Sequence, residues 1–465
     1  MKIKFLGGSQ EVTGSTHVLM TEKSTVVRDA GLFQGSRKLA KEKNKKIYEE
    51  IEGKIDAIVL SHAHIDHCGN LPSFFKAGCS APIYAQHATV DLCKHMLLDS
   101  AHIQSIDAQY MNKKLVKKGE EPNVEPLYSQ EDVEITLSYF KGFEYDKTIK
   151  ITDDIAVTSY NAGHILGACL NVFEITEKDK ILKIGYAFDL GRYNLPIIED
   201  PTQLKDIDVL VIESTYGNRY HRDINQACDL LTGIVNRVAN RNGKIIIPSF
   251  ALERTQEIIY TLLKMYESNS CEKLPIIIDS PLAISVTEVF MKHKAIFDND
   301  TTKFMENNLG KYKEYIRITK SVEESKALNT DKTPMIIISA SGMCESGRIL
   351  HHLKNNVENP NNAVVIVGYQ AENTLGRRIV EREKRLKIFG EYYQMNAERI
   401  VLNTYSGHAD KLDLMTFIKN VGERCKTFVL VHGESKAITD LSNEVRLMFP
   451  DARIETPKRL DTLTF

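Results

Sequence analysis

The stretch "SHAHIDHCGN" (residues 61–70) directly follows the apolar run "AIVL" (residues 57–60). Burying unpaired imidazoles and a carboxylate costs several kcal/mol unless partners or a metal compensate, so an ordinary core does not favour this pattern. A lone histidine here would be read as a solvated turn residue. Neutral imidazole and carboxylate are also the ligands of zinc, iron and manganese, so we interpret the segment as a metal-binding loop at a strand end. Its four candidate ligands are His62, His64, Asp66 and His67.

Composition is that of an ordinary globular protein. The chain has 465 residues, 42% of them hydrophobic, which predicts two domains. Its net charge is only −2, so a nucleic-acid site would have to be a local basic groove. Residues 36–46 and 112–119 are lysine-rich and either line such a groove or form solvated faces. The eight cysteines form no CxxC pair, which argues against a disulfide framework or a zinc ribbon. No membrane-spanning run or cleavable leader is apparent, so we expect a cytoplasmic protein without a membrane partner.

The pattern of apolar runs predicts an α/β fold with two kinds of sheet. Short β-rich runs separated by turns and helical stretches fill the first 200 residues. The middle instead contains the continuous apolar strands "GKIIIPSF", "LPIIIDSP", "PMIIISASG" and "AVVIVGY", which are typical of a parallel sheet covered on both faces. The strands "RIVLNTY" and "TFVLVHGE" then look like a return to the first domain. We therefore expect boundaries near Asp206 and Met395, which divide the chain into residues 1–205, 206–395 and 396–465.

Small and polar residues end the strands of the middle region. Ligands of parallel sheets bind beyond the carboxyl ends of the strands. The turn "SASGMCESGRIL" (residues 339–350) runs from a strand into an expected helix, so its backbone amides and Arg348 suit a phosphate, although an ordinary glycine-rich connection explains the turn equally well. The candidate substrate-binding residues of this rim are Ser249, Ser339, Ser341, Gly342 and Arg348, and Ser280 ends a neighbouring strand.

Further candidate ligands follow later strands, each beside a glycine. They are His164 in "NAGHILGA", Asp189 in "YAFDLGR" and His432 in "LVHGE". Each alone is compatible with a solvated turn. Together with the first four residues they complete two coordination spheres around one bridging carboxylate.

A set of motifs in this order identifies a family resemblance: "HAHIDH", "GHILGA", "DLGR", "ESTYG", "PSFALERTQE", "DSPLA", "SASGM", "SGHAD" and "VHGE". The chain resembles metallo-β-lactamase-fold ribonucleases of the β-CASP group over essentially its whole length. It is most similar to the nuclease subunit of the pre-mRNA cleavage and polyadenylation factor and its short prokaryotic counterparts. The resemblance implies an αββα metallo-β-lactamase sandwich with an inserted β-CASP domain that contains a mainly parallel sheet.

The resemblance also implies a role for each motif residue. Asp29 should support the ligand loop without binding metal itself, and Glu213 should orient His408 at the scissile phosphate. Asp66, His408 and Glu213 are thus the expected catalytic residues. The expected cofactors are two Zn²⁺, with Mn²⁺ or Fe as alternatives. His62, His64 and His164 should hold one ion, Asp66, His67 and His432 the other, and Asp189 should bridge them.

The implied reaction is hydrolysis of single-stranded RNA by a metal-bridging hydroxide, giving 5′-phosphate and 3′-hydroxyl ends. We expect cleavage within the chain, and Tyr216 and Tyr369 are candidates for base stacking. The choice of RNA rests on His432, where DNA-directed relatives have valine. The sequence does not distinguish a monomer from a homodimer.

Several positions depart from the family pattern. Ala187 and Phe188 replace the usual serine and glycine before Asp189, Arg28 replaces an apolar residue, and Leu252 and Glu253 also differ. Two alternative functions remain open at this point: a catalytically silent RNA-binding scaffold, and a metallohydrolase of small thioesters or lactones on the same fold. Silent members of the family usually lose metal ligands, whereas all seven remain here together with Glu213 and His408. The small-ester hydrolase leaves the inserted domain unexplained.

Overall fold

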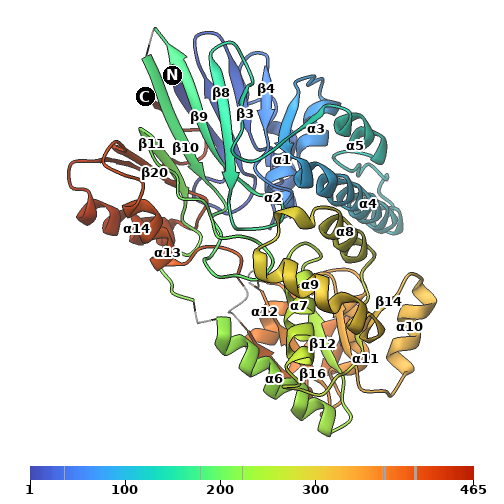
Figure 1. Cartoon of the computed structure of the whole chain (residues 1–465). Coiled ribbons are helices and arrows are strands. Elements are labelled where there is room, and N and C mark those ends of the chain that lie inside the picture. Colours follow the sequence, from blue (N-terminus) through green and yellow to red (C-terminus); the bar gives the residue numbers. More distant parts are fainter. Residues whose placement is uncertain (36, 179, 222–223, 369, 371–372, 403–405) are drawn as a thin grey trace. The chain divides into compact units, whose positions relative to one another are not determined.

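The computed structural model describes residues 1–465 except 36, 179, 222–223, 369, 371–372 and 403–405, so Tyr369 lies outside the described residues. The chain divides into two compact units (Figure 1). The first comprises residues 1–193, 200–220 and 408–465, and the second comprises residues 194–199 and 221–407. Within the described part of the chain, none of the helices combines the length and hydropathy of a bilayer span.

Two mixed sheets form the centre of the first unit. In the first sheet the order is β22 (Thr462–Thr464), β1 (Lys2–Gly7), β2 (Thr16–Met20), β3 (Thr25–Arg28), β4 (Ala57–Val59), β5 (Ile83–Gln86) and β6 (Phe140–Phe143). In the second sheet it is β21 (Arg453–Glu455), β20 (Thr427–Val431), β11 (Val209–Glu213), β10 (Lys180–Ala187), β9 (Cys169–Glu177), β8 (Ile155–Asn161) and β7 (Thr148–Lys150).

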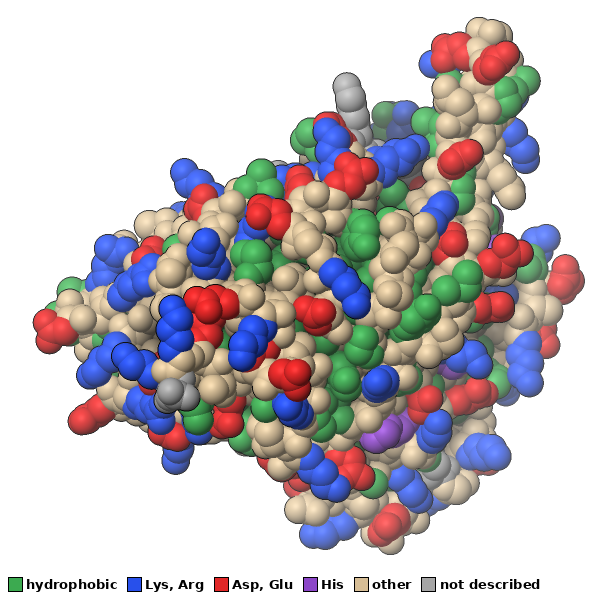
Figure 2. All heavy atoms as spheres, turned by 90° about the horizontal axis from the view of Figure 1, so that it is seen from above, with side chains coloured by type: hydrophobic (Ala, Val, Ile, Leu, Met, Phe, Trp, Pro, Cys, Tyr) green, Lys and Arg blue, Asp and Glu red, His purple; other side chains and the backbone are tan. Residues whose placement is uncertain are grey.

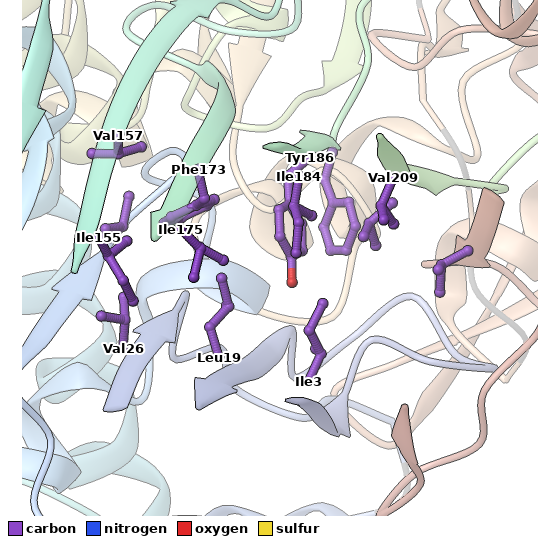
Figure 3. Packing of buried hydrophobic residues seen from close by; sticks show 14 of the residues in the cluster. Ile3, Leu19, Val26, Ile155, Val157, Phe173, Ile175, Ile184, Tyr186 and Val209 are labelled. Atoms are coloured by element: carbon purple, nitrogen blue, oxygen red, sulfur yellow. The ribbon is translucent and has the colours of Figure 1, made fainter. Parts of the chain in front are cut away.

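The two sheets pack face to face through buried aliphatic and aromatic side chains. Alternation along the strands directs one set of side chains inward, and each fully buried aliphatic contributes about 1.5–3 kcal/mol. In Figure 3 residues of the first sheet lie opposite residues of the second, and this core cluster includes Ile3, Leu19, Val26, Ile155, Phe173, Ile184 and Tyr186.

Helices cover the outer faces of this sandwich. Against the first sheet lie α2 (Ile65–Cys68), α3 (Leu71–Lys76), α4 (His87–Lys117) and α5 (Gln130–Leu137), with α1 (Arg37–Lys46) before them in the chain. Against the second sheet lie α13 (Lys411–Lys419) and α14 (Ser435–Met448) (Figure 1). The predicted αββα sandwich is therefore confirmed.

The second unit contains a six-stranded parallel sheet, as predicted. Its order is β14 (Ile316–Ile318), β13 (Ile276–Ile278), β15 (Ile336–Ser339), β12 (Ile245–Pro248), β16 (Ala363–Ile366) and β19 (Glu398–Val401). An antiparallel hairpin is made by β17 (Arg385–Ile388) and β18 (Glu391–Gln394). The helices are α6 (Ile224–Asn240), α7 (Arg254–Glu267), α8 (Pro281–Lys292), α9 (Asn299–Tyr312), α10 (Val322–Thr330), α11 (Ile349–Asn356) and α12 (Leu375–Val380), with short 3-10 turns at Lys294–Ile296 and Lys313–Tyr315.

The divisions between the units differ from those expected near Asp206 and Met395. The first unit continues to Tyr220 because β11 pairs in parallel with both β10 and β20. It resumes only at His408, because β19 pairs in parallel with β16 and so belongs to the second unit. The run "RIVLNTY" thus does not mark the return to the first domain.

A buried carboxylate fastens the strand ends of the second unit. Asp279 directly follows β13, and its oxygens lie 2.5 Å from Ser325 Oγ, 2.5 Å from His352 Nε2 and 2.6 Å from an Arg348 guanidinium nitrogen. Thr319 also donates to it. Burial alone would raise the pKa of Asp279, but these hydrogen bonds outweigh it and hold the pKa below its ordinary value.

We expect Asp279→Asn to lower the free energy of unfolding by about 3 kcal/mol at pH 7, because it breaks a buried charge network. A carboxylate with a depressed pKa contributes stability above its unfolded pKa of about 3.9, and this contribution disappears as the pH falls. The difference from wild type should therefore shrink below about pH 4. Urea unfolding across this range measures it.

The exposed Asp451→Asn variant is the control and should change stability by less than about 0.5 kcal/mol. A difference between Asp279→Asn and wild type that stays constant at all pH values would contradict the charge-network explanation.

Candidate metal centre

The seven predicted ligands all lie in the first unit, on the loops that follow its strands. An apolar strand fixes the backbone before each ligand segment. The polar side chains that follow the strand ends therefore face one another. His62 and His64 follow β4, Asp66 and His67 lie on the short α2, His164 follows β8, Asp189 follows β10, and His432 follows β20.

The first group of side chains converges on one point. His64 Nδ1 lies 3.0 Å from His62 Nε2 and 3.2 Å from His164 Nε2. Asp189 Oδ2 lies 3.4 Å from His62 Nε2 and 3.5 Å from His164 Nε2. With zinc–nitrogen bonds of about 2.0–2.1 Å, ligand atoms of a tetrahedral zinc lie about 3.3 Å apart. The four side chains therefore fit one metal ion.

A second group adjoins the first. His67 Nε2 lies 3.3 Å from His432 Nε2, and Asp66 Oδ2 lies 3.8 Å from both of these nitrogens. These three side chains have ligand atoms close enough to hold a second ion. The two groups are the same two sets of residues that the sequence predicted.

Asp189 lies between the two groups. Its Oδ2 faces the first group, whereas its Oδ1 lies 3.5 Å from His67 Nε2 and 3.3 Å from His432 Nδ1. The side chain is 1% exposed, and its Oδ1 accepts no hydrogen bond from any residue that the structure describes. A buried carboxylate oxygen without a donor fits a position beside a cation.

The protonation of the first group suits ligation. Burial lowers the pKa of His62 and His164, and it lowers the pKa of His64 to about 3. These imidazoles are therefore neutral near pH 7, which is the form that binds metal.

Asp29 supports the second group from behind. Its Oδ2 lies 2.8 Å from His67 Nδ1, and its two oxygens also accept from the backbone and the hydroxyl of Ser61 at 2.7 and 2.8 Å. The residue has a φ of 59°, a left-handed conformation that Asp and Asn tolerate better than most residues. A carboxylate on the far nitrogen of a metal-binding imidazole fixes the tautomer and the ring orientation.

Arg28 and Phe188, two departures from the family pattern, pack together beneath the cluster. The Arg28 guanidinium lies 2.7 Å from Asp29 Oδ2 and 4.3 Å from the centre of the Phe188 ring. Phe188 is buried, and its ring centre lies 5.7 Å from that of His432. The bulky ring therefore forms part of the floor of the site, and Arg28 compensates the charge of Asp29.

His408 and Glu213 lie beside Asp189. His408 Nδ1 lies 3.1 Å from both carboxylate oxygens of Glu213, and its Nε2 lies 4.0 Å from Asp189 Oδ2. Burial alone would lower the pKa of His408, but the charges of Glu213 and Asp189 outweigh it and raise the pKa to about 9. The ring centre of Tyr216 lies 6.2 Å from that of His408.

The five residues predicted to bind substrate lie in the second unit, and their side chains are engaged in its fold. Ser249 Oγ accepts from Thr255, and Ser339 Oγ donates to the carbonyl of Asp279. Ser341 Oγ accepts from the backbone of the turn, and a Cβ on Gly342 would lie 2.8 Å from the Phe250 ring. Arg348 donates to Asp279 and to the Thr319 and Lys320 carbonyls. Their role in binding stays a prediction.

Sequence reasoning missed two serines beside the cluster. Ser61 Oγ lies 2.9 Å from His62 Nδ1 and so joins this ring to Asp29. Its position directly before His62 was the available signal. Ser15 Oγ lies 3.4 Å from His67 Nε2, but 52 residues separate the two in sequence and no local pattern links them.

Three family models match the chain. A metallo-beta-lactamase superfamily domain matches residues 18–193, a Beta-Casp domain matches residues 255–379, and a Zn-dependent metallo-hydrolase RNA specificity domain matches residues 392–456. Together with the two groups of ligands they define a protein of the metallo-β-lactamase superfamily.

Similar proteins narrow the assignment. A ribonuclease of Thermus thermophilus is 32% identical over 448 residues, covering 96% of each chain. An RNase J-like protein of Methanocaldococcus jannaschii is 31% identical, covering 93% of this chain and 92% of its own. The transcription termination factor FttA of Methanosarcina mazei is 29% identical, and the match covers 98% of this chain and 70% of that protein. The chain belongs to the β-CASP ribonuclease family.

A solved structure supports the fold alone. The crystal structure of a protein of unknown function from Enterococcus faecalis matches with a TM-score of 0.56 and 14% identity, over 100% of this chain and 99% of that one.

We expect Asp29→Asn to weaken metal binding by about 10–100-fold. The Asn amide holds His67 less firmly than the carboxylate does, and the substitution removes a negative charge beside the ligands. Asn is nearly isosteric and tolerates the positive φ, although the buried Arg28 loses its ion pair and some stability is lost. Chelator competition measures the affinity. Asp451→Asn serves as the control, and unchanged affinity in Asp29→Asn would show that Asp29 does not support the ligands.

Proposed function

We propose that this protein is a zinc-dependent ribonuclease that hydrolyses phosphodiester bonds within single-stranded RNA. The observation that carries the proposal is the position of the Asp189 carboxylate, whose two oxygens face two separate groups of histidines. The relatives named as a ribonuclease and as an RNase J-like protein support RNA as the substrate, as does the match to an RNA specificity domain.

The residues at the site divide into two binding sets and a proton donor. One ion would be held by His62, His64, His164 and Asp189, and the other by Asp66, His67 and His432, with Asp189 Oδ1 also facing the second set. When bound, such a metal pair supplies a water-derived nucleophile near neutral pH and neutralises charge on the phosphoryl group.

The proposal assigns the proton transfer to His408. Glu213 accepts from its Nδ1, so the Nε2 edge faces the side of Asp189 where the scissile phosphate would lie. The carboxylate fixes the ring and favours its protonated form. His408 then donates its proton to the departing 3′-oxygen, which leaves a 3′-hydroxyl on one product and a 5′-phosphate on the other.

His408→Gln should keep the bound metal yet lower turnover by at least about 100-fold, because a general acid contributes about 10²–10⁴-fold. Metal content by elemental analysis and single-turnover cleavage measure the two effects separately. If the variant loses metal as readily as it loses activity, His408 belongs to the ligand set and not to the proton transfer.

The direct test compares a long single-stranded RNA with a circular RNA of the same sequence, each incubated with zinc-loaded protein. The circle has no ends, so its cleavage demonstrates attack within the chain. We expect the circle to be cut, the products to carry 5′-phosphates, and a chelator to abolish the reaction.

The control variants are Asp66→Ala and Asp189→Ala, with the exposed Asp153→Ala as the matched substitution. Asp189→Ala should lose metal and activity together, whereas Asp153→Ala should keep both. Shortening of the linear RNA alone would identify an exonuclease. If neither RNA is cut while a small thioester is hydrolysed, the ribonuclease proposal fails.

A further inference from the structure

A further basic region belongs to the second unit, whereas the ligand groups belong to the first. On the face that Figure 2 displays, Lys and Arg side chains are interspersed with Asp and Glu, in keeping with the net charge of −2. Residues 377–387 instead carry mainly positive charge, because six of these eleven residues are Arg or Lys. They run from α12 into β17, and α12 packs against that strand.

The β17–β18 hairpin separates an apolar face from a cationic one. Leu386 and Ile388 point into the core of the unit, so Arg385 and Lys387 point outward. Tyr392 of β18 is paired with Lys387 in the antiparallel register and is 65% exposed. The Lys387 ammonium lies 5.8 Å from the centre of this ring.

A hollow of about 450 Å³ lies between α12 and the hairpin. More cations than carboxylates line this hollow, and the ring of Tyr392 also lines it. The cations are those of Arg377, Arg378, Arg385 and Lys387, and the carboxylates are those of Glu381 and Glu383. Sites for small drug-like molecules are mainly apolar, whereas this wall is charged. It therefore suits a polyanion.

Several of these cations carry uncompensated charge. Arg377 is paired with Glu381 at 2.7 Å. Among the residues that the structure describes, no carboxylate oxygen lies within 4 Å of a side-chain nitrogen of Arg378, Arg385 or Lys387. Charges left without partners around one hollow repel one another, and a bound anion relieves that repulsion.

We propose that α12 and the β17–β18 hairpin form a binding surface for single-stranded RNA, with phosphates on Arg378, Arg385 and Lys387 and a base stacked on Tyr392. This inference rests on the proposed function, because it assigns the RNA substrate a second point of contact. An exposed aromatic ring between cations is the arrangement by which proteins hold single strands without reading their sequence.

The exposed ring is what favours RNA over an acidic protein segment. A row of carboxylates would be attracted by the cations but would gain little from Tyr392. An unpaired base stacks on the ring, and base–aromatic stacking strengthens binding substantially.

The test measures binding of an oligouridylate 20-mer to the full protein by fluorescence anisotropy. EDTA is present so that metal-dependent cleavage does not occur. The variants are Arg385→Ser with Lys387→Ser, and separately Tyr392→Ser. The matched control is Lys311→Ser with Lys313→Ser, which removes two exposed lysines with the same i, i+2 spacing outside the proposed surface.

The Arg385/Lys387 variant should bind about tenfold more weakly, and the slope of log K against log salt should become shallower by about 1.4, since each lost phosphate contact of a single strand contributes about 0.7. Tyr392→Ser should also bind about tenfold more weakly but keep the slope, because stacking releases no counterions. The control pair should bind nearly as wild type does.

An equal loss of RNA affinity in the control variant would overturn the proposal, because it would mean that any exposed lysine contributes to binding. Displacement of the RNA by polyglutamate at the same charge concentration would also overturn it, in favour of an acidic protein partner. If wild type cleaves RNA while these variants bind normally, only this inference fails. If wild type binds as described but cleaves nothing, only the nuclease proposal fails.

Discussion

The buried carboxylate of Asp189 is the constraint on which the first unit depends. A charge with so little access to water is tolerated only if positive or hydrogen-bonding groups surround it. Those groups come from loops after β4, β8 and β20, so the ends of strands from both sheets must meet at one rim. The packing of the two sheets through their apolar faces supplies that alignment, and the site follows from it.

Each unit has a buried aspartate just after a strand, but the two carboxylates differ in their hydrogen bonds. Asp279, like Asp189, directly follows a strand and is buried. Each oxygen of Asp279 has hydrogen-bond donors, from Thr319 and Arg348 on one side and from Ser325 and His352 on the other. Asp189 Oδ1 has none among the described residues. A carboxylate that its own fold satisfies is structural, whereas one left unsatisfied is prepared for a ligand.

Local patterns in the sequence predicted the helix-covered sheets, the parallel sheet and the gathering of the ligands, because these depend on strand periodicity and on which residue follows each strand. The αββα arrangement of the first domain was implied by the family resemblance. Local patterns could not decide which sheet an apolar strand joins. The strands within "RIVLNTY" and "TFVLVHGE" were both expected to return to the first domain, yet β19 pairs with β16 and only β20 pairs with β11. The network around Asp279 joins residues up to 73 positions apart, so no local pattern indicated that Arg348 donates to this carboxylate.

The order of the ligands along the chain has a consequence for biosynthesis. The ligand groups begin at His62 and end at His432, with the whole second unit inserted between Asp189 and the last histidine. The strand β20, which directly precedes that histidine, fills a place beside β11 in the second sheet. A ribosome-bound chain therefore lacks both a strand and a ligand until His432 has been synthesised. A nascent chain that has not reached this residue cannot assemble the site on its own message.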